Sequence, residues 1–381
     1  MEIQKIPSPA YVLERRLLRQ NLELMQRVQQ ESGANIILAL KGFSLYHAFP
    51  FVKQYLGGAT ASSLYEARLI FEEMGVKAHT YSAAYVPEHF EELMNYSSHL
   101  VFNSLNQWRL YQDKVATSEH KISCGIRVNP EYSDVETDLY NPALPGSRLG
   151  ELVENFEELG GILPKGIEGL HCHTLCESSA DSFEKLIVAF EKRFGHFLPQ
   201  LKWVNFGGGH LMTRKDYDVE KLIHLIKAFK EKYDVEVILE PGSAVAWQAG
   251  FLVATVLDVV NSRGIKTLVL NVSFTGHMPD TLEMPYRPKV RGASETPIEG
   301  KPTYRLGGNS CLAGDFQYEY SFENEVKIGN KIVFEDMIHY TIVKTTMFNG
   351  VYHPRISILE EDDTLNIVRT FDYSDYRNRM G

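Results

Sequence analysis

The chain has 381 residues, of which 44% are hydrophobic and 23% charged, and its formal net charge is −10. This length allows a large core and two domains, and the acidic balance without a lysine- or arginine-rich block argues against nucleic acid and anionic membranes as partners. No apolar run approaches eighteen residues and the N-terminus lacks a secretory signal, so we expect no membrane span. Four cysteines in so long a chain do not suggest a disulfide framework. We therefore expect a cytoplasmic protein with reduced thiols.

The first two thirds of the chain alternate between strand-like and helix-like segments. Residues 1–12 look extended, and an apolar stripe predicts a helix from Leu13 to Ser32 that Gly33 ends. Short apolar runs then predict strands at 35–40, 58–61, 78–82, 99–103, 121–128, 167–173, 201–206 and 235–240. Helices are predicted between them at 62–74, 87–96, 104–114, 179–195 and 217–231. Eight such strands favour an α/β fold, a (β/α)8 barrel, over a doubly wound open sheet, because no dinucleotide fingerprint is present.

After Gly250 the pattern changes to strands joined by turns, which predicts a second, all-β domain. The predicted strands are 251–260, 267–273, 303–306, 325–334, 340–347 and 365–371.

Lys41 follows directly on the apolar run Asn35–Leu40 and precedes Gly42. Lysine is rarely buried, so its place at the end of a buried strand needs a reason. Either the stem packs on the strand while the ammonium reaches water, or the amine is desolvated and forms a Schiff base with an aldehyde cofactor.

Other polar residues end the remaining predicted strands, where the working residues of a (β/α)8 barrel lie. Gly207-Gly208-Gly209 can direct backbone N–H groups at a phosphate, or can simply form a tight turn. Glu240, before Pro241-Gly242, can be a structural carboxylate paired with Arg127 or the partner of a pyridinium nitrogen.

Two segments contain cysteine and further reactive side chains. In His171-Cys172-His173, strand alternation places the two histidines on one face, and no second ligand pair exists elsewhere, so we predict no metal site. His173 suits either stacking on a flat ring or an ordinary place in the core. Cys311, in the small-residue segment 307–315, is either a buried inert thiol or a reactive one in a polar loop.

Taken together, these motifs resemble the fold-type III pyridoxal-phosphate decarboxylases, the family of ornithine, arginine and diaminopimelate decarboxylases. The resemblance covers nearly the whole chain and rests on 39–41, 63–66, 172–173, 207–209, 240–242, 311–315 and Tyr340 with 348–350. It implies a barrel at 13–245 that binds pyridoxal 5'-phosphate, and a β domain formed by 1–12 and 246–381 that carries the Cys311 loop. It also implies a homodimer whose active sites are shared across the interface.

The resemblance further implies a role for each site residue. Lys41 holds the cofactor and is catalytic, and Cys311 enters the active site of the partner subunit as proton donor. The residues implied in cofactor binding are Lys41, Arg127, His173, Gly207, Gly208, Gly209, Glu240, Gly242 and Tyr340. Within this set His173 stacks on the ring, Glu240 bonds the pyridinium nitrogen and Arg127 orients Glu240. Cys176 stands where relatives place a phosphate-binding serine.

Within this family the chain is most similar to the branch that decarboxylates polyamine precursors, carboxynorspermidine and carboxyspermidine, to norspermidine and spermidine. The segments that carry this likeness are 38–43, 147–150, 173–177, 278–283 and 310–315. Diaminopimelate enzymes carry an arginine near 278–285, whereas this chain has Asp280 and Glu283, which suit distal amines. Asp280, Glu283 and Asp315 are the predicted substrate-binding residues. A decarboxylase of diaminopimelate or another basic amino acid, a racemase, and a cofactor-binding regulator without activity are the alternatives.

Overall fold

A computed structural model describes residues 2–135, 137–157 and 160–381, and the chain divides into two compact units. One unit comprises residues 21–245, and the other comprises residues 1–20 together with 246–381. No helix in the described part of the chain is long and apolar enough to cross a membrane.

The unit of residues 21–245 is built on a parallel sheet that closes on itself. Its strands follow the order β2-β10-β9-β8-β7-β6-β5-β4-β3. Their bounds are β2 (Asn35–Ile36), β3 (Leu38–Ala39), β4 (Ala59–Ala61), β5 (Ala78–Ser82), β6 (Ser97–Phe102), β7 (Ser123–Arg127), β8 (Ile167–His171), β9 (Trp203–Asn205) and β10 (Glu236–Leu239). The first and last members, β2 and β3, are two halves of one segment: β2 pairs with β10 and β3 pairs with β4. The predicted barrel is therefore confirmed.

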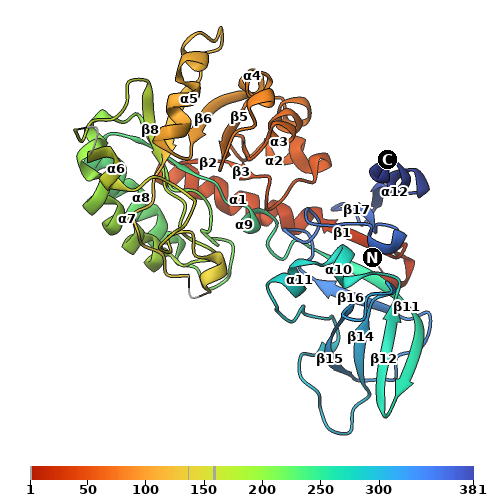
Figure 1. Ribbon diagram of the computed structural model, residues 1–381. Helices are drawn as coiled ribbons and strands as arrows, with labels where there is room; N and C mark the ends of the chain where they lie inside the picture. The colour runs from red at the N-terminus through yellow and green to blue at the C-terminus, as the bar shows by residue number, and fades with distance from the viewer. Residues whose placement is uncertain (1, 136, 158–159) are drawn as a thin grey trace. The chain divides into compact units, whose positions relative to one another are not determined.

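Helices lie on the outside of these strands (Figure 1). They are α1 (Arg15–Ser32), α2 (Phe49–Val52), α3 (Leu64–Leu69), α4 (Pro87–Tyr96), α5 (Leu105–Ala116), α6 (Val153–Glu157), α7 (Ala180–Phe194), α8 (Val219–Tyr233) and α9 (Ser243–Ala246). Four of them begin directly after a side chain that accepts a hydrogen bond from the first turn, namely α3, α5, α7 and α8 after Ser63, Ser104, Ser179 and Asp218. These caps satisfy otherwise unpaired N–H groups and fix where each helix starts.

Trp203 fills the interior of the barrel. It packs with Ile37, Val101 and Ile238. A Cβ atom added at Gly125 or Gly169 would lie 2.3 or 2.0 Å from its indole ring. Because real Cβ atoms never approach that closely, the two glycines on β7 and β8 are what allow the indole to enter.

The second unit is built on a mixed sheet in the order β13-β15-β14-β12-β11-β1-β17-β18, with β16 paired to β11. The strand bounds are β1 (Ala10–Glu14), β11 (Gly250–Ser262), β12 (Ile265–Leu270), β13 (Ala293–Ser294), β14 (Thr303–Gly307), β15 (Phe316–Phe322), β16 (Lys331–Glu335), β17 (Arg355–Leu359) and β18 (Leu365–Arg369). Three helices accompany them: α10 (Phe274–His277), α11 (Asp280–Glu283) and α12 (Tyr373–Met380).

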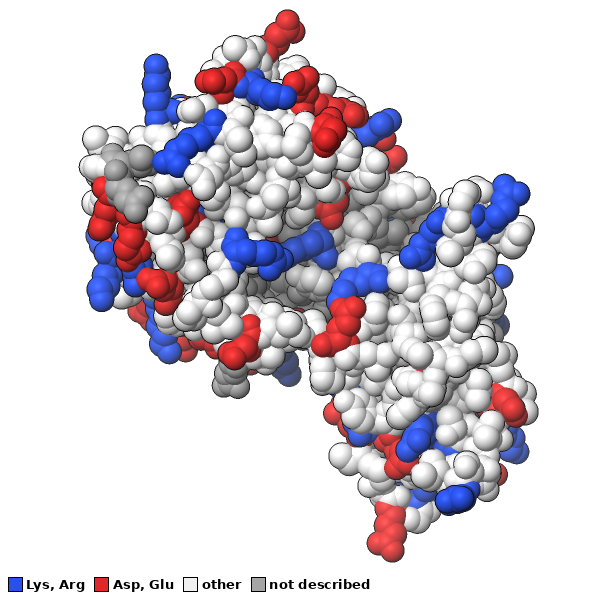
Figure 2. All heavy atoms as spheres, in the orientation of Figure 1, with Lys and Arg blue, Asp and Glu red and all other residues white. Residues whose placement is uncertain are grey.

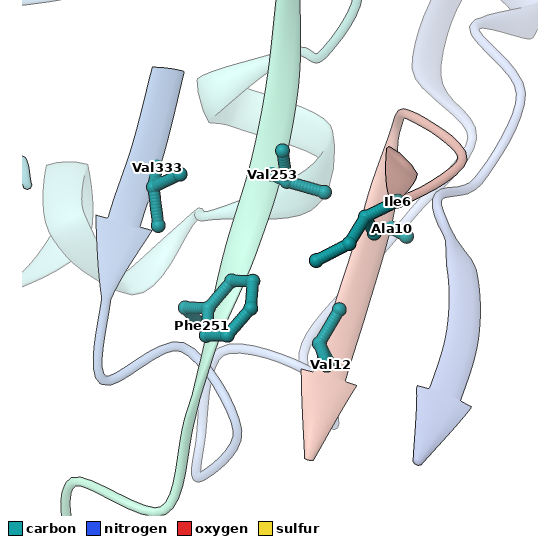
Figure 3. Close-up of a cluster of buried hydrophobic side chains, with 6 residues drawn as sticks. All are labelled: Ile6, Ala10, Val12, Phe251, Val253 and Val333. Atoms are coloured by element: carbon teal, nitrogen blue, oxygen red, sulfur yellow. The ribbon is translucent and has the colours of Figure 1, made fainter. Parts of the chain in front are cut away.

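Part of the core of this unit lies where β1, β11 and β16 meet. Ile6, Ala10, Val12, Phe251, Val253 and Val333 are buried there against one another (Figure 3). The pairing of β1 with β11 and β17 gives the N-terminal segment, extended in the sequence prediction, its place in this sheet.

The predicted strand at 340–347 is wrong, and the strands β13, β15 and β17 were not predicted. Thr341, Ile342 and Val343 favour a strand by composition. However, Tyr340 has a left-handed backbone with φ of 46°, and the N–H groups of Val343 and Lys344 turn back to its carbonyl at 3.2 Å. Turn bonding has therefore overridden the β preference of these residues.

Candidate active site

Lys41 lies in the turn that follows β3, against the turn after β10. The N–H of Ala39 donates to the carbonyl of Pro241 at 3.0 Å. A Cβ atom on Gly42 would lie 2.7 Å from the Cα of Gly242, so only glycine allows the two turns to touch. This contact brings Lys41 and Glu240 to the same end of the barrel.

The nearest polar partner of Lys41 is His173, whose Nε2 lies 3.2 Å from the lysine Nζ. The other ring nitrogen, Nδ1, accepts the N–H of Gly208 at 2.9 Å and so bears no proton when the ring is neutral. The proton then sits on Nε2 and points at Nζ, which has to be a neutral amine to accept it. The hydrogen-bond pattern thus favours the nucleophilic form of the lysine.

The electrostatic surroundings of both side chains agree with this assignment. Although part of the Lys41 residue is accessible to solvent, the protein atoms around its amine displace water from it. This desolvation and the charge of Arg127 lower the pKa of Lys41, against an opposing effect of Glu240. Burial, followed by the charges of Lys41 and Arg127, lowers the pKa of His173 well below its ordinary value. Both groups are therefore biased toward their neutral forms.

The glycine tract after β9 is folded tightly against its neighbours. Gly209 has φ of 86°, and a Cβ there would lie 2.2 Å from the carbonyl oxygen of Leu175. The N–H groups of Gly207 and Gly208 donate to Asn205 and His173. Within the described residues the N–H groups of Gly209 and His210 donate no hydrogen bond. These two amides are therefore the ones in the tract that remain free for an anion.

Glu240 directly follows β10, is buried, and has one hydrogen-bond partner on each carboxylate oxygen. His171 Nε2 lies 3.3 Å from Oε2, and the Asn205 amide donates to Oε1 at 2.7 Å. Burial alone would raise the pKa of Glu240, but the hydrogen bonds from His171 and Asn205 lower it below its ordinary value. Glu240 is therefore an anion at neutral pH.

Arg127, at the end of β7, is buried near this carboxylate but hydrogen-bonds elsewhere. Its guanidinium donates to the carbonyl of His173 at 2.9 Å and packs over the ring of Tyr81 at 4.8 Å. The donors that fix Glu240 are instead His171 and Asn205. Sequence reasoning did not assign them this role, although the alternation along 167–173 already placed His171 on the same face as His173.

The residues predicted for cofactor chemistry are thus grouped in the barrel unit, namely Lys41, Arg127, His173, Gly207, Gly208, Gly209, Glu240 and Gly242. The remaining predicted residues belong to the other unit and are described separately: Tyr340, Cys311, Asp315, Asp280 and Glu283. Tyr340 lies in the turn segment described above, so the structure gives its backbone but its predicted contact with phosphate stays a prediction.

Cys311 is exposed in the loop between β14 and β15, and Asp315 organises that loop. The N–H of Cys311 donates to Asn349 Oδ1 at 2.8 Å. Asp315 Oδ2 accepts the Ser310 hydroxyl at 2.5 Å, and its Oδ1 accepts the N–H of Phe274 at 2.6 Å. Both carboxylate oxygens are therefore engaged in holding the loop, and a role of Asp315 in substrate binding stays a prediction.

Asp280 and Glu283 lie on α11 and differ in their surroundings. Asp280 is 6% exposed; its Oδ2 accepts hydrogen bonds from Tyr286 and Thr341 at 3.2 Å each, while its buried Oδ1 has no partner in the described residues. Burial raises the pKa of Asp280 against the effect of those two donors. Glu283 forms an ion pair with Lys344. Asp280 thus offers one unused buried oxygen, as a cation-binding carboxylate would.

The barrel site fits pyridoxal phosphate by its own chemistry. It combines a lysine biased toward the neutral amine, free amides at Gly209 and His210 for a phosphate, and an anionic carboxylate suited to a protonated ring nitrogen. Neither a dinucleotide nor a metal ion would require all three of these features in one site.

Comparisons with known proteins agree with this chemistry. The family model described as pyridoxal-dependent decarboxylase, C-terminal sheet domain, matches residues 11–338. A carboxyaminopropylagmatine decarboxylase from Synechocystis sp. is 49% identical, and the match covers 100% of this chain and 97% of that protein. A carboxynorspermidine/carboxyspermidine decarboxylase from Campylobacter jejuni is 46% identical over the whole of both chains.

Solved structures give the same result. A crystal structure of carboxynorspermidine decarboxylase from Campylobacter jejuni, complexed with norspermidine, superposes with a TM-score of 0.90 at 44% identity, covering 98% of this chain and 100% of that one. A diaminopimelate decarboxylase from Helicobacter pylori superposes with a TM-score of 0.83 at 17% identity over 99% and 98% of the two chains, which shows the shared fold. The chain therefore belongs to the pyridoxal-dependent decarboxylase family.

Proposed function

We propose that this decarboxylase removes the carboxylate of carboxynorspermidine, carboxyspermidine or both, giving norspermidine and spermidine. The observation that carries the proposal is the end-to-end match, at 46% identity, to a relative named for these two substrates. Diaminopimelate decarboxylases match at lower identity, 17% for the Helicobacter pylori structure and 24% and 27% for two relatives that align with only part of this chain. The chain keeps both Lys41 and Cys311, which argues against a regulator without activity.

The cofactor, when bound, accepts the electrons that are released as the carboxylate leaves as carbon dioxide. In this proposal Lys41 holds the cofactor through its neutral amine, and the amides of the Gly207–Gly209 tract and His210, with Tyr340, hold the phosphate. His173 packs on the ring, while Gly242 keeps the strand-end turn close to Lys41. Glu240 keeps the ring nitrogen protonated, and Arg127 fixes the backbone of His173.

Cys311 is the proposed proton donor to the carbon that loses carbon dioxide. We propose that it acts in the active site of the partner subunit of a homodimer, in the cytoplasm, where thiols stay reduced. Its exposure and its tethered backbone suit this role. In the same proposal residues 13–245 form the cofactor-binding domain, and 1–12 with 246–381 form the β domain that presents the Cys311 loop.

Asp280, Glu283 and Asp315 are the proposed partners of the distal amines; Asp280 is the best supported, and Asp315, whose oxygens already accept four hydrogen bonds, the least. The single unpartnered oxygen of Asp280 suits the point charge of an ammonium. A guanidinium, the distal group of carboxyaminopropylagmatine, donates in a fork and is matched best by two free oxygens. Because the Synechocystis relative is named for that substrate, carboxyaminopropylagmatine is the second candidate.

The test is a comparison of substrates with purified enzyme and added pyridoxal phosphate. Released carbon dioxide is measured with carboxynorspermidine, carboxyspermidine, carboxyaminopropylagmatine, diaminopimelate, ornithine and arginine. We expect the first two to give the highest kcat/KM. They differ by one methylene, which a pocket discriminates by only about 1–3 kcal/mol, so both should react. A higher kcat/KM with the guanidino compound or with diaminopimelate would overturn the proposal.

Variants of the two proposed catalytic residues test the mechanism. Lys41→Ala should lose the visible absorbance of the bound cofactor together with turnover. Cys311→Ala should keep that absorbance but lose most turnover or misplace the proton. A Lys41→Ala enzyme with full activity, or a Cys311→Ala enzyme with unchanged rate and product, contradicts the assignment.

A further inference from the structure

His171 has no part in the mechanism above, although it lies at the centre of the site. It ends β8 with its imidazole 2% exposed, and its Nε2 lies 3.3 Å from Glu240 Oε2. Asn205, on the neighbouring strand β9, donates to the other oxygen, Oε1, at 2.7 Å. The Asn205 amide cannot be reversed, because its Oδ1 accepts the N–H of Gly207 at 2.8 Å. Each oxygen of Glu240 thus has one side-chain partner, Asn205 from the adjacent strand β9 and His171 from β8, the next strand beyond it.

The location of the proton on His171 follows from its two nitrogens. The ionised carboxylate of Glu240 can only accept, so Nε2 carries the hydrogen. Nδ1 is buried and has no partner in the described residues. Burial lowers the pKa of His171 against the opposing effect of Glu240, and a second proton on Nδ1 would be an unpaired buried donor that also faces the charge of Arg127. The imidazole is therefore the neutral tautomer protonated on Nε2.

The plane of this imidazole is fixed by packing. Tyr81, from β5, stacks on it with ring centroids 5.3 Å apart and an interplanar angle of 25°. Tyr81 is itself held by a hydrogen bond to Asn103 at 2.8 Å and by the guanidinium of Arg127 at 4.8 Å. The direction of the Nε2–H bond is thus set by the packing of Tyr81 and Arg127 as well as by the contact with Glu240.

We propose that His171 is a positioning residue which, as a neutral donor, holds Glu240 as a fully charged anion toward the pyridine nitrogen of the cofactor. A neutral donor matters because an imidazolium would cancel the charge that keeps the ring nitrogen protonated. The inference rests on the proposed pairing of Glu240 with that nitrogen. Loss of the donor would either turn the carboxylate away or make it more basic, and both changes move the proton off the ring nitrogen.

The matched pair His171→Gln and His171→Met tests this proposal, because the two side chains have similar length and only glutamine retains an N–H donor. His99→Gln is the control, since His99 also lines the barrel but makes no hydrogen bond to Glu240 among the described contacts. Each holoenzyme is prepared with pyridoxal phosphate labelled with 15N in the ring. The 15N chemical shift reports the protonation of that nitrogen, and kcat/KM is followed against pH.

We expect His171→Met to shift the 15N signal toward unprotonated pyridine and to lose about tenfold to a hundredfold in kcat/KM, as for a hydrogen bond to a charged group. His171→Gln should restore the protonated signal and most of the activity. If His171→Met fails to fold, His171→Phe, which keeps a flat ring for Tyr81, replaces it. The proposal is overturned if the 15N signal of His171→Met, or of His171→Phe in its place, is unchanged, whether or not that variant and His171→Gln lose activity equally.

This readout is independent of the substrate. If the enzyme prefers another carboxylated amine, the proposed function fails while the 15N signal still decides the role of His171. If the labelled nitrogen of the unaltered enzyme is unprotonated, the pairing with Glu240 fails and the inference fails with it.

Discussion

Replacing Asp315 should loosen the loop that carries Cys311, because its carboxylate accepts four hydrogen bonds. Oδ1 takes the N–H groups of Phe274 and Thr275 at 2.6 and 3.2 Å, and Oδ2 takes the N–H and hydroxyl of Ser310 at 3.2 and 2.5 Å. Asp315→Ala leaves the buried N–H of Phe274 without its partner and removes the hydrogen bonds that the N–H and hydroxyl of Ser310 donate. A hydrogen bond to a charged group contributes about 1.5–3 kcal/mol, and water can replace the more exposed donors, so we expect a loss of about 3 kcal/mol.

Thermal unfolding checks this value. A loss of about 3 kcal/mol corresponds to a fall of about 6–12 °C in the melting temperature of a domain of this size. Asp315→Asn keeps Oδ1 for Phe274 and Thr275 but turns an amide toward Ser310, so about half that fall is expected. In both variants kcat should drop with Cys311 displaced, while the visible absorbance of the bound cofactor stays. An unchanged melting temperature combined with a raised KM would refute this reasoning and support the substrate-binding role predicted from the sequence.

Three further perturbations have defined outcomes. Gly209→Ala introduces a Cβ atom 2.2 Å from the Leu175 carbonyl oxygen at a residue whose φ is 86°, so cofactor affinity, measured by absorbance titration, should fall at least about tenfold. Gly195→Ala is the control, because a Cβ atom there meets open space. Equal affinities of the two variants would contradict the assignment of the glycine tract to phosphate binding. Burial lowers the pKa of His210 to about 4 and that of His277 to about 3. Below about pH 6.5 the unfolded chain therefore binds more protons than the folded chain. The contribution of these two residues to stability is complete above that pH and is lost as the pH falls toward their pKa values in the folded protein. At pH 5 each should cost about 2 kcal/mol, and His210→Phe should flatten the dependence of melting temperature on pH; an unaltered slope would exclude His210 as a source. Gly169→Ala should destabilise the barrel through its 2.0 Å clash with Trp203, and Trp203→Phe should relieve part of that loss in a double-mutant comparison of melting temperatures; additive losses would contradict direct contact.

Acidic and basic side chains both lie among uncharged ones on the face seen in Figure 2. A small cationic substrate remains compatible with the net charge of −10.

The sequence by itself determined the barrel and the residues at its functional end. Eight apolar runs separated by amphipathic segments have few other ways to bury their strands, and the carboxyl ends of parallel strands in a barrel converge whatever the loops do. For that reason Lys41, His173, the glycine tract and Glu240 could be grouped from their positions alone. The same reasoning could not exclude a strand at 340–347, because local preference there is overridden by turn bonding around Tyr340.

Only the tertiary structure decided which atoms face one another. Glu240 is held by His171, 69 residues away in the chain, and by Asn205, 35 residues away, and such pairs depend on strand register and rotamer. The same applies to the proton on His173 Nε2, which follows from the N–H of Gly208, and to Asp315, whose oxygens are occupied by its own loop. Residue type limits what a side chain can do, but its hydrogen-bond partners, which only the folded chain supplies, decide which of those possibilities it realises.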